Sequence, residues 1–388
     1  MVSALMAHDS TLLQECRELV RAVTPFPTLE ALHGSLAWRE LGPRFDALLH
    51  TVRRHQTAGS PEPPRDPGKV RVVQWNIEHG NWYDQVEHAF LHRAELAAPD
   101  VVTLDEVDLG CARAGNRDVT ADLARALNLH AAWAPLFLET TVGRDDDPRM
   151  AAGRENTFGL FGIAVLSRWP IGEVRVIDLP SPQKVQFDLE RMVGRHCALV
   201  AEILRPGAPF VAVAAHLEVH RTRAHRAAQV RVIADALAHE RRPVVLAGDF
   251  NTHTFDRGLW HSALHGATAL VLWPGPALRR RLVHPDRGFS REPLFDVLRE
   301  AGFRWEAWTD DRPTLLLRED RLEEAQSLPG PLREAARRVL DWAIHRGTLR
   351  LDWIVGRGWS SGTGNTVTGL DGPGRASDHA PITAELAS

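Results

Sequence analysis

The chain has 388 residues, of which 44% are hydrophobic and 25% charged, and its formal net charge at pH 7 is −4. This composition is typical of a soluble globular protein, and it offers no excess of positive charge to hold nucleic acid by charge alone. Three cysteines, an odd number spread far apart, exclude a disulfide framework and a thiolate metal cluster. No stretch of about 18 apolar residues occurs, so we expect a cytoplasmic protein without a membrane span.

Residues 1–56 are predicted to form a helical N-terminal arm. TLLQECRELVRAV and RFDALLHTVRRH repeat apolar residues at three- and four-residue spacing, as amphipathic helices do. Residues 57–68, TAGSPEPPRDPG, are rich in Pro, Gly and Ser and predict a linker. We therefore expect residues 69–388 to form the functional domain and to fold without the arm.

The body mixes strand-like and helix-like segments. The predicted strands are 69–77, 99–107, 130–137, 162–171, 197–204, 209–219, 243–250, 350–356 and 381–386. The predicted helices are 84–96, 119–128 and 222–240, and Thr222 is the expected N-cap of the last. Several strands follow one another directly, which predicts mixed sheets covered by helices rather than one parallel sheet.

Residues 253–347 interrupt this order. They contain many Pro, Arg and Trp residues and two predicted helices, at 292–302 and 332–344. We interpret the segment as an insertion on the scaffold, and an insertion at this place could act as a lid over a cleft.

Six predicted strands have metal-binding or proton-transferring residues at or beside one end. The residues are Asn76, Glu78, Asp105, Glu106, Asp108, His216, Glu218, His220, Asp249, Asn251, Asp352, Asp378 and His379. One such residue usually belongs to a turn or a cap, but six polar strand ends predict a shared cleft at a sheet edge. Oxygen donors without cysteine favour a hard cation such as Mg²⁺ or Mn²⁺, and imidazoles favour proton transfer or phosphate binding.

Seven motifs occur in an order that resembles a known family. QWNIEHG, PDVVTLDEVD, GIAVLSRWPI, AAHLEVH, AGDFNTHT, RLDWIVG and ASDHAPI together resemble the endonuclease/exonuclease/phosphatase superfamily. That superfamily includes deoxyribonuclease I, abasic-site endonucleases, neutral sphingomyelinases, inositol-polyphosphate 5-phosphatases and deadenylases. The resemblance covers residues 69–388 and implies a deoxyribonuclease I-like fold, a two-sheet mixed α/β sandwich flanked by helices.

The resemblance implies a divalent metal site, for Mg²⁺ or Mn²⁺. Glu106 matches the metal-binding glutamate of the family, Asn76 matches an asparagine near metal and phosphate, and Asp378 matches the final metal-side carboxylate. One position departs from the pattern, because the residue before the glutamate is usually Gln and here is Asp105.

The resemblance also implies five catalytic residues. Asp249 and Asn251 match the pair that positions the nucleophilic water and holds a phosphate oxygen. His379 matches the catalytic histidine, and Asp352 matches the carboxylate that orients it. His216 matches a second histidine of the nuclease-I-like and sphingomyelinase-like branches.

The pairing of an acid with an amide in GDFN has a chemical reason. In-line attack at phosphorus needs an acceptor for the proton of water and a donor to the phosphoryl oxygen. Residues two apart in an extended segment point to the same side, so we expect Asp249 and Asn251 to face one phosphate. Gly248 would allow the backbone to approach or turn there.

Two weaker patterns remain open, and one branch of the family is disfavoured. On an extended strand, His216, Glu218 and His220 would share a face and could bind zinc, although zinc-protease histidines stand four apart on a helix. Asn156 and Arg195 lie near motif strands and could bind the substrate, or could equally be structural. The abasic-site endonuclease branch uses a catalytic tyrosine, and the single tyrosine, Tyr83, lies outside that motif, so we do not expect this branch.

We therefore predict a divalent-metal-dependent hydrolase of phosphoric esters. A phosphodiesterase or nuclease acting on nucleic acid is the first choice. A phosphatase or phosphodiesterase for a small phosphorylated molecule or lipid headgroup is the alternative, favoured by the acidic net charge and by a lid-like insertion. A non-catalytic ligand-binding scaffold is the third possibility, and the oligomeric state stays open.

Overall fold

The computed structural model describes most of the chain. The described residues are 2–57, 66, 68–144, 146–219, 221–252, 268–269, 272–288, 291–316, 348–371 and 374–387. Much of the segment 253–347 lies outside these ranges, including the helix predicted at 332–344. Its described part contains α10 (Gly275–Val283) and α11 (Leu294–Glu300), and its interpretation as an insertion stays a prediction.

The larger sheet is mixed. Its order is β1-β4-β5-β3-β2-β15-β14, and the short β7 also pairs with β4. β2 and β3 run parallel, whereas the other neighbours pair antiparallel. The strands are β1 (Arg53–His55), β2 (Lys69–Asn76), β3 (Val101–Leu109), β4 (His130–Glu139), β5 (Leu160–Ser167), β7 (Met192–Gly194), β14 (Ser361–Thr366) and β15 (Ile382–Ala387).

The smaller sheet is also mixed, with the order β13-β10-β9-β8-β6. β9 and β10 run parallel, and the other neighbours pair antiparallel. The strands are β6 (Ile171–Asp178), β8 (Cys197–Ile203), β9 (Phe210–Ala215), β10 (Val244–Asp249) and β13 (Asp352–Arg357). β11 (Leu315–Leu316) and β12 (Thr348–Leu349) form a separate pair.

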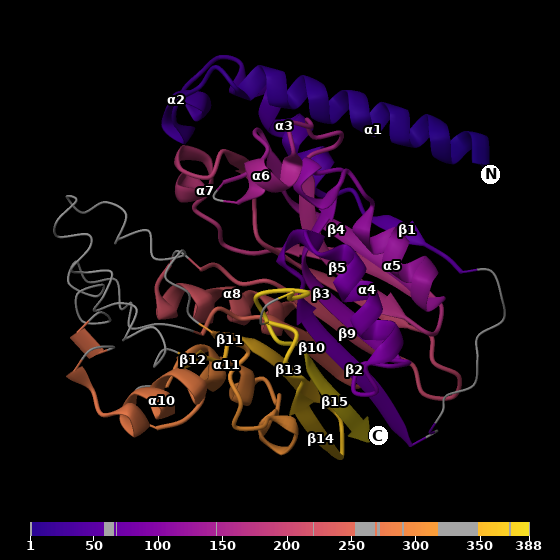
Figure 1. Ribbon diagram of the computed structural model, residues 1–388, viewed down its shortest axis with the longest axis vertical. Coiled ribbons are helices and arrows are strands. Elements are labelled where there is room, and N and C mark those ends of the chain that lie inside the picture. The colour runs from indigo at the N-terminus through magenta and orange to yellow at the C-terminus, as the bar shows by residue number, and fades with distance from the viewer. Residues whose placement is uncertain are drawn as a thin grey trace.

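The two sheets pack face to face, and helices flank the sandwich (Figure 1). Successive strand residues point to opposite faces, so Val72 of β2 joins the cluster between the sheets while Val73 joins the cluster under the helices. On the outer face of the smaller sheet, Val213 packs in one cluster with Ile233 of α8 (Arg223–Ala236) and Leu298 of α11. This arrangement confirms the predicted two-sheet mixed α/β sandwich with flanking helices.

The helices begin and end close to the predicted positions. Thr222 is the N-cap of α8, as predicted, and its side-chain oxygen accepts a hydrogen bond from the backbone N–H of His225 at 3.2 Å. The strand predicted at 209–219 ends earlier, at Ala215. The other α-helices are α1 (Val2–Val23), α2 (Leu29–His33), α3 (Trp38–Leu49), α4 (Tyr83–His92), α5 (Val119–Leu127), α6 (Asp147–Ala151) and α7 (Lys184–Asp188), besides α10 and α11 given above. The 3₁₀ turns are η1 (Glu78–Gly80), η2 (Ala112–Ala114) and η3 (Glu306–Trp308).

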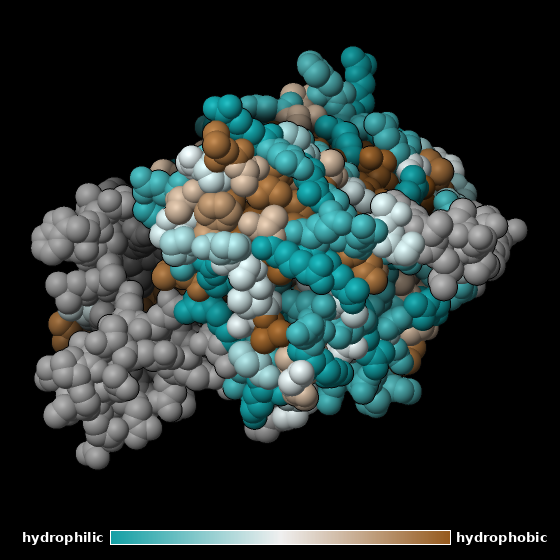
Figure 2. All heavy atoms as spheres, turned by 90° about the horizontal axis from the view of Figure 1, so that it is seen from above, coloured by the Kyte–Doolittle hydropathy of each residue, from teal (hydrophilic) through white to brown (hydrophobic). Residues whose placement is uncertain are grey.

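The N-terminal arm packs directly on the body. Leu19 of α1 and Phe45 of α3 belong to the same hydrophobic cluster as Trp133 of β4. The arm also contributes a strand that we did not predict, because β1 pairs antiparallel with β4. The end of the molecule that carries the arm has a mostly hydrophilic surface with apolar groups between (Figure 2). These contacts argue against the expectation that residues 69–388 fold alone, although the domain division itself stays a prediction.

Candidate active site

The predicted metal residues of β2 and β3 lie at neighbouring strand ends. β2 and β3 are parallel, with Asn76 opposite Asp105, so both strands deliver polar side chains to the same sheet edge. The pairing of β3 with β5 shifts between Leu104 and Val107, a bulge that redirects the intervening residues. Glu106, within this bulge, has a φ of 53°, and its Oε1 accepts a hydrogen bond from Asn76 Nδ2 at 2.9 Å.

The smaller sheet brings two aspartates to the same place. Asp249 ends β10 and stands directly opposite Asp352, which begins the antiparallel β13. A Cβ on Gly248 would lie 1.9 Å from the carbonyl oxygen of Ala215, so only glycine allows β10 to approach β9 this closely. Asp249 reaches across to the larger sheet, where its Oδ2 lies 3.3 Å from Asn76 Nδ2.

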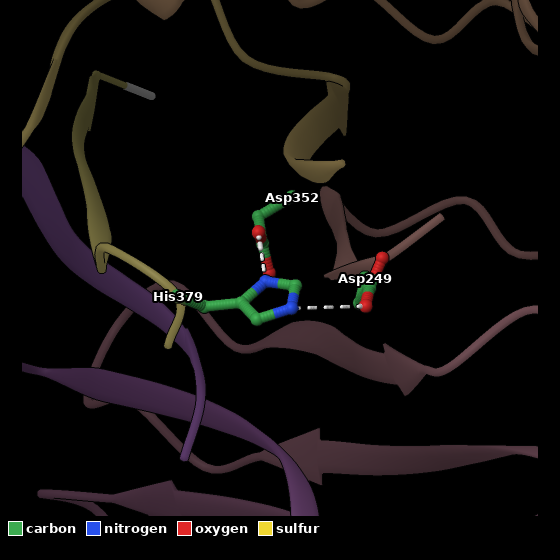
Figure 3. A group of neighbouring side chains, drawn as sticks. All are labelled: Asp249, Asp352 and His379. Atoms are coloured by element: carbon green, nitrogen blue, oxygen red, sulfur yellow. Dashed lines mark hydrogen bonds and ion pairs between the residues drawn. The ribbon is translucent and has the colours of Figure 1, made fainter. Parts of the chain in front are cut away.

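Asp352 and His379 form a buried pair. Asp352 Oδ2 lies 2.7 Å from His379 Nδ1, and both side chains are buried (Figure 3). A carboxylate can only accept, so Nδ1 carries a hydrogen and Nε2 faces Asp249 Oδ2 at 3.8 Å. The backbone of His379 is fixed as well, because Trp75 Nε1 donates to its carbonyl at 2.9 Å. The pair thus has the geometry of a carboxylate that orients an imidazole.

The surrounding carboxylates change the ionisation of this pair. Burial alone lowers the pKa of His379, but Asp352, Asp249 and Asp378 outweigh it and hold that pKa well above its usual range. Burial and then the neighbouring Asp352 raise the pKa of Asp249 to about 6, against the opposing effect of His379. The site therefore holds an imidazolium beside a carboxylate whose pKa is close to neutrality.

His216 lies just beyond the end of β9 and faces the same oxygen of Asp249. Its Nε2 is 3.7 Å from Asp249 Oδ2. Burial, followed by the neighbouring His196 and His379, lowers the pKa of His216 to about 3. His216 is therefore neutral, and it can donate one hydrogen bond but supplies no positive charge.

Asn251 corrects one step of the sequence argument. It has a φ of 49°, so the segment is not extended and the expected alternation from Asp249 to Asn251 is wrong. The backbone N–H of Asn251 donates to Asp249 Oδ1 at 2.9 Å, and its side-chain Nδ2 donates to the Leu217 carbonyl at 2.8 Å. The backbone N–H of Asn251 thus holds the Asp249 carboxylate in place. The two residues lie together because of this turn and its hydrogen bond, and not because they share one face of an extended strand.

Asp105 and Gln74 link the two sheets behind the site. Asp105 Oδ2 accepts hydrogen bonds from the Asp249 backbone N–H at 2.6 Å and from Gln74 Nε2 at 2.8 Å. Gln74 Nε2 also lies 3.4 Å from Asp352 Oδ1. Burial, then repulsion from Asp249, raises the pKa of Asp105 well above its usual range. Asp105 therefore serves as a hydrogen-bond acceptor that sets the position of Asp249.

The donor groups of the site suit a hard cation. Asp249, Asp352 and His379 each offer one ligand atom, all within 4.8 Å of one another, the only such group of three in the described parts of the chain. However, the close contact of Asp352 with His379 is already a hydrogen bond. Buried Asp105 Oδ1 has no hydrogen-bond partner among the described residues, and burial, followed by mutual repulsion, raises the pKa values of Asp105 and Asp249. A divalent cation held by oxygen donors would offset this excess of negative charge.

The two residues predicted to bind substrate have other partners. Asn156 Oδ1 accepts from the Ala112 backbone at 2.8 Å, and its Nδ2 donates to the Thr141 carbonyl at 2.8 Å. Arg195 is buried, and its guanidinium contacts Asp178 and the Leu49 carbonyl. These contacts give both side chains a structural role and do not favour the substrate-binding role.

The geometry of the HLEVH segment does not favour zinc. His216 and Glu218 lie beyond the end of β9, so they do not share a strand face as the zinc alternative required. Glu218 is buried and faces away from Asp249 toward His196 Nε2 at 3.2 Å and Gln186 Nε2 at 2.9 Å. His220 lies outside the described residues.

The sequence profile of the Endonuclease/Exonuclease/phosphatase family matches residues 73–379, more than half of the chain. The chain belongs to the endonuclease/exonuclease/phosphatase family. The match spans all the strand ends described above, and members of this family are generally hydrolases of phosphoester bonds. A comparison with curated proteins returned no match.

Several solved structures resemble the chain. An endonuclease/exonuclease/phosphatase from Beutenbergia cavernae DSM 12333 is 20% identical, covers 82% of this chain and 72% of its own, and has a TM-score of 0.46. The human Nocturnin catalytic domain with bound sulfate anion is 16% identical, with coverages of 87% and 97% and a TM-score of 0.45. Beta toxin 275-280 from Staphylococcus aureus is 15% identical, with coverages of 81% and 99% and a TM-score of 0.46. These likenesses carry no argument about activity.

Sequence reasoning missed two residues of the site. Gln74 stands two residues before Asn76 on β2, so strand periodicity could have assigned it to the same face. His79 contacts Glu106, but its orientation depends on a left-handed backbone turn, and position 79 has no glycine from which that turn could be predicted.

Among the described helices, none is long and apolar enough to span a membrane.

Proposed function

We propose that the protein is a divalent-metal-dependent hydrolase of phosphoric esters. The supporting observation is the set of nitrogen groups around one oxygen, Asp249 Oδ2. Asn76 Nδ2 lies 3.3 Å from that oxygen, His216 Nε2 3.7 Å and His379 Nε2 3.8 Å. Attack of water on a phosphoryl group needs a base that accepts the proton of water and, beside it, donors that can bind the phosphoryl oxygens, and this cluster offers both.

In this proposal Asp249 accepts the proton of the attacking water. Its pKa of about 6 suits a base that works near neutral pH, and the backbone N–H of Asn251 holds its other oxygen. The His379 imidazolium donates through Nε2 to a phosphoryl oxygen, and Asp352 keeps the hydrogen on Nδ1. Neutral His216 donates one hydrogen bond to the same group.

Glu106, Asp378 and Asn76 are the residues that would hold the cation. A bound Mg²⁺ or Mn²⁺ would act as a Lewis acid that stabilises negative charge on the phosphoryl oxygens. The buried excess of carboxylates is the observation that supports this assignment. Glu106 is about one fifth exposed, whereas Asp378, Asp249 and His379 are more deeply buried, so Glu106 lies nearest to solvent.

A phosphodiester of nucleic acid is the first substrate class that we propose. A phosphorylated small molecule or lipid headgroup is the second, and it is favoured by two observations. The groups assigned to the reaction are buried, which suits a small phosphorylated group better than a broad nucleic-acid surface. Arg195 and Arg113, arginines near the motif strands, are already paired with carboxylates: Arg195 with the half-exposed Asp178, and Arg113 with the buried Asp108 and Glu139.

A panel of phosphoesters tests the proposal. Purified protein is incubated with Mg²⁺ or Mn²⁺ and with single- and double-stranded DNA, RNA, nucleotides, inositol phosphates or sphingomyelin. Release of nucleotides would support the first class, and release of phosphate or phosphocholine the second. Asp249→Asn serves as the inactive control. Absence of turnover on every substrate would contradict the proposal and favour a ligand-binding scaffold.

A further inference from the structure

His79 lies at the open side of the candidate metal site and has no role in the function proposed above. Its Nε2 is 3.3 Å from Glu106 Oε2, and its Nδ1 is 3.7 Å from Asp108 Oδ1. The imidazole edge also packs against the ring of Phe161, with centroids 5.1 Å apart. His79 and Glu106 are 22% and 21% exposed, so this pair is more exposed than Asn76 and Asp378, the other proposed ligands.

An unusual backbone turn brings His79 to this position. Glu78, His79 and Gly80 have φ values of 47°, 64° and 76°, three consecutive residues in the left-handed region. A non-glycine residue in that region costs about 1–3 kcal/mol and persists only when its surroundings fix it. Here Arg375 Nε and Nη2 contact the Glu78 carboxylate at 3.0 and 2.6 Å, and Asn76 Oδ1 accepts from the Glu78 backbone N–H at 3.1 Å.

The result is that both oxygens of Glu106 are held from one segment. Asn76 Nδ2 donates to Oε1 at 2.9 Å, and His79 Nε2 faces Oε2 at 3.3 Å. The opposite side of the imidazole faces Asp108, which is itself fixed by Arg113 through two contacts of 2.8 and 2.9 Å. Glu106 stands on a bulge of β3 and has a positive φ of its own, so its backbone departs from the regular strand at the point where the Asn76 and His79 contacts meet its side chain.

We propose that His79 is a positioning residue that holds the Glu106 carboxylate in the orientation that binds the divalent cation. The inference rests on the proposed function, because it takes Glu106 as a metal ligand. Residues that contact a metal ligand and fix its orientation typically contribute about 10–100-fold to metal affinity. His79 does not bind the cation itself and acts through Glu106.

The test is calorimetric titration of the full chain with Mn²⁺. His79→Asn is the main variant, because asparagine tolerates the left-handed backbone while its side chain is shorter than imidazole. His79→Ala is the second variant, and His88→Ala, an exposed histidine on α4, is the matched control. We expect both His79 variants to bind Mn²⁺ about 10–100-fold more weakly and the control to bind like wild type. Melting temperatures in excess chelator should stay unchanged in His79→Asn.

Two results would overturn the inference and can be told apart from failure of the proposed function. If wild type binds Mn²⁺ and His79→Asn binds it within twofold, His79 does not position Glu106, while the metal assignment stands. A lower melting temperature in chelator with unchanged affinity would give His79 a structural role only. If wild type itself binds no Mn²⁺, the proposed metal dependence fails, and the inference fails with it.

Discussion

Replacing Asp352 by Asn tests whether His379 depends on its buried carboxylate. Asp352 Oδ2 contacts His379 Nδ1 at 2.7 Å, and Asp352 Oδ1 lies 3.4 Å from Gln74 Nε2. Because Gln74 donates, the oxygen of the new amide should face Gln74, and its NH₂ should face His379. Nδ1 then becomes an acceptor, and the hydrogen moves to Nε2. The variant keeps the shape of the pair but reverses the tautomer and removes the charge.

We expect kcat to fall by about 10²- to 10⁴-fold, which is roughly 3–5 kcal/mol of transition-state stabilisation. The pH dependence should change in a defined direction. Among the carboxylates around His379, Asp352 raises the pKa of that histidine most. Without Asp352, the imidazolium therefore loses its proton at a lower pH. The alkaline limb of the kcat profile should therefore move to lower pH. Metal affinity should change little, because Asp352 is not among the proposed ligands.

The assay is turnover from pH 5 to 10 on the best ester of the panel, together with Mn²⁺ calorimetry. Asp100→Asn is the matched control, since Asp100 is also buried and accepts from Arg168 Nε at 2.8 Å but precedes the opposite end of β3. The control should lose stability and keep its kcat. Near-wild-type turnover in Asp352→Asn, or a defect that extra metal cures, would refute the assignment of Asp352 as the partner of His379.

Four further outcomes are expected. Excess chelator should abolish turnover, and added Mg²⁺ or Mn²⁺ should restore it. Full activity in chelator would refute the proposed metal dependence. Restoration by zinc alone would favour the zinc alternative at HLEVH. Glu106→Gln should lose activity that high metal concentration partly restores, as a metal titration of turnover would show. Deleting residues 1–66 should lower the melting temperature or the solubility, because strand β1 and the arm's apolar contacts are lost; an unchanged melting temperature would contradict this. Asp105→Asn should keep both accepted hydrogen bonds and its thermal stability, whereas Asp105→Ala should lower the unfolding free energy by about 1–3 kcal/mol.

The fold could be predicted because its signals are local. A short apolar run predicts a strand such as β10, and the polar residues that follow the run mark the end of the strand. The order of these ends along the chain predicts that Asn76, Asp249 and Asp378 share one cleft. Chain order and strand period carry this information because parallel neighbours end at one sheet edge.

The partners of the arginines could not be predicted, because they are distant in sequence. Arg195 donates to the carbonyl of Leu49, 146 residues away, and Arg53 of the arm pairs with Asp118. No local pattern distinguishes such an arginine from one that binds a phosphate. Strand β1 of the arm was not predicted for the same reason, since it has only three residues and pairs with β4, which lies far along the chain.

Backbone strain explains why the site was harder to predict than the fold. Glu106, Asn251 and His79 have positive φ values of 53°, 49° and 64°, and none is a glycine. Each conformation costs about 1–3 kcal/mol, so the sandwich core must hold it. Glu106 is held by the bulge of β3, Asn251 by Leu217 and Asp249, and the His79 turn by the Glu78–Arg375 pair. In each case long-range contacts fix a local geometry that the residue alone would not adopt. The same contacts place Glu106 in the site and set His79 and the Asn251 backbone beside its carboxylates, so the site stands where local backbone preferences are overruled.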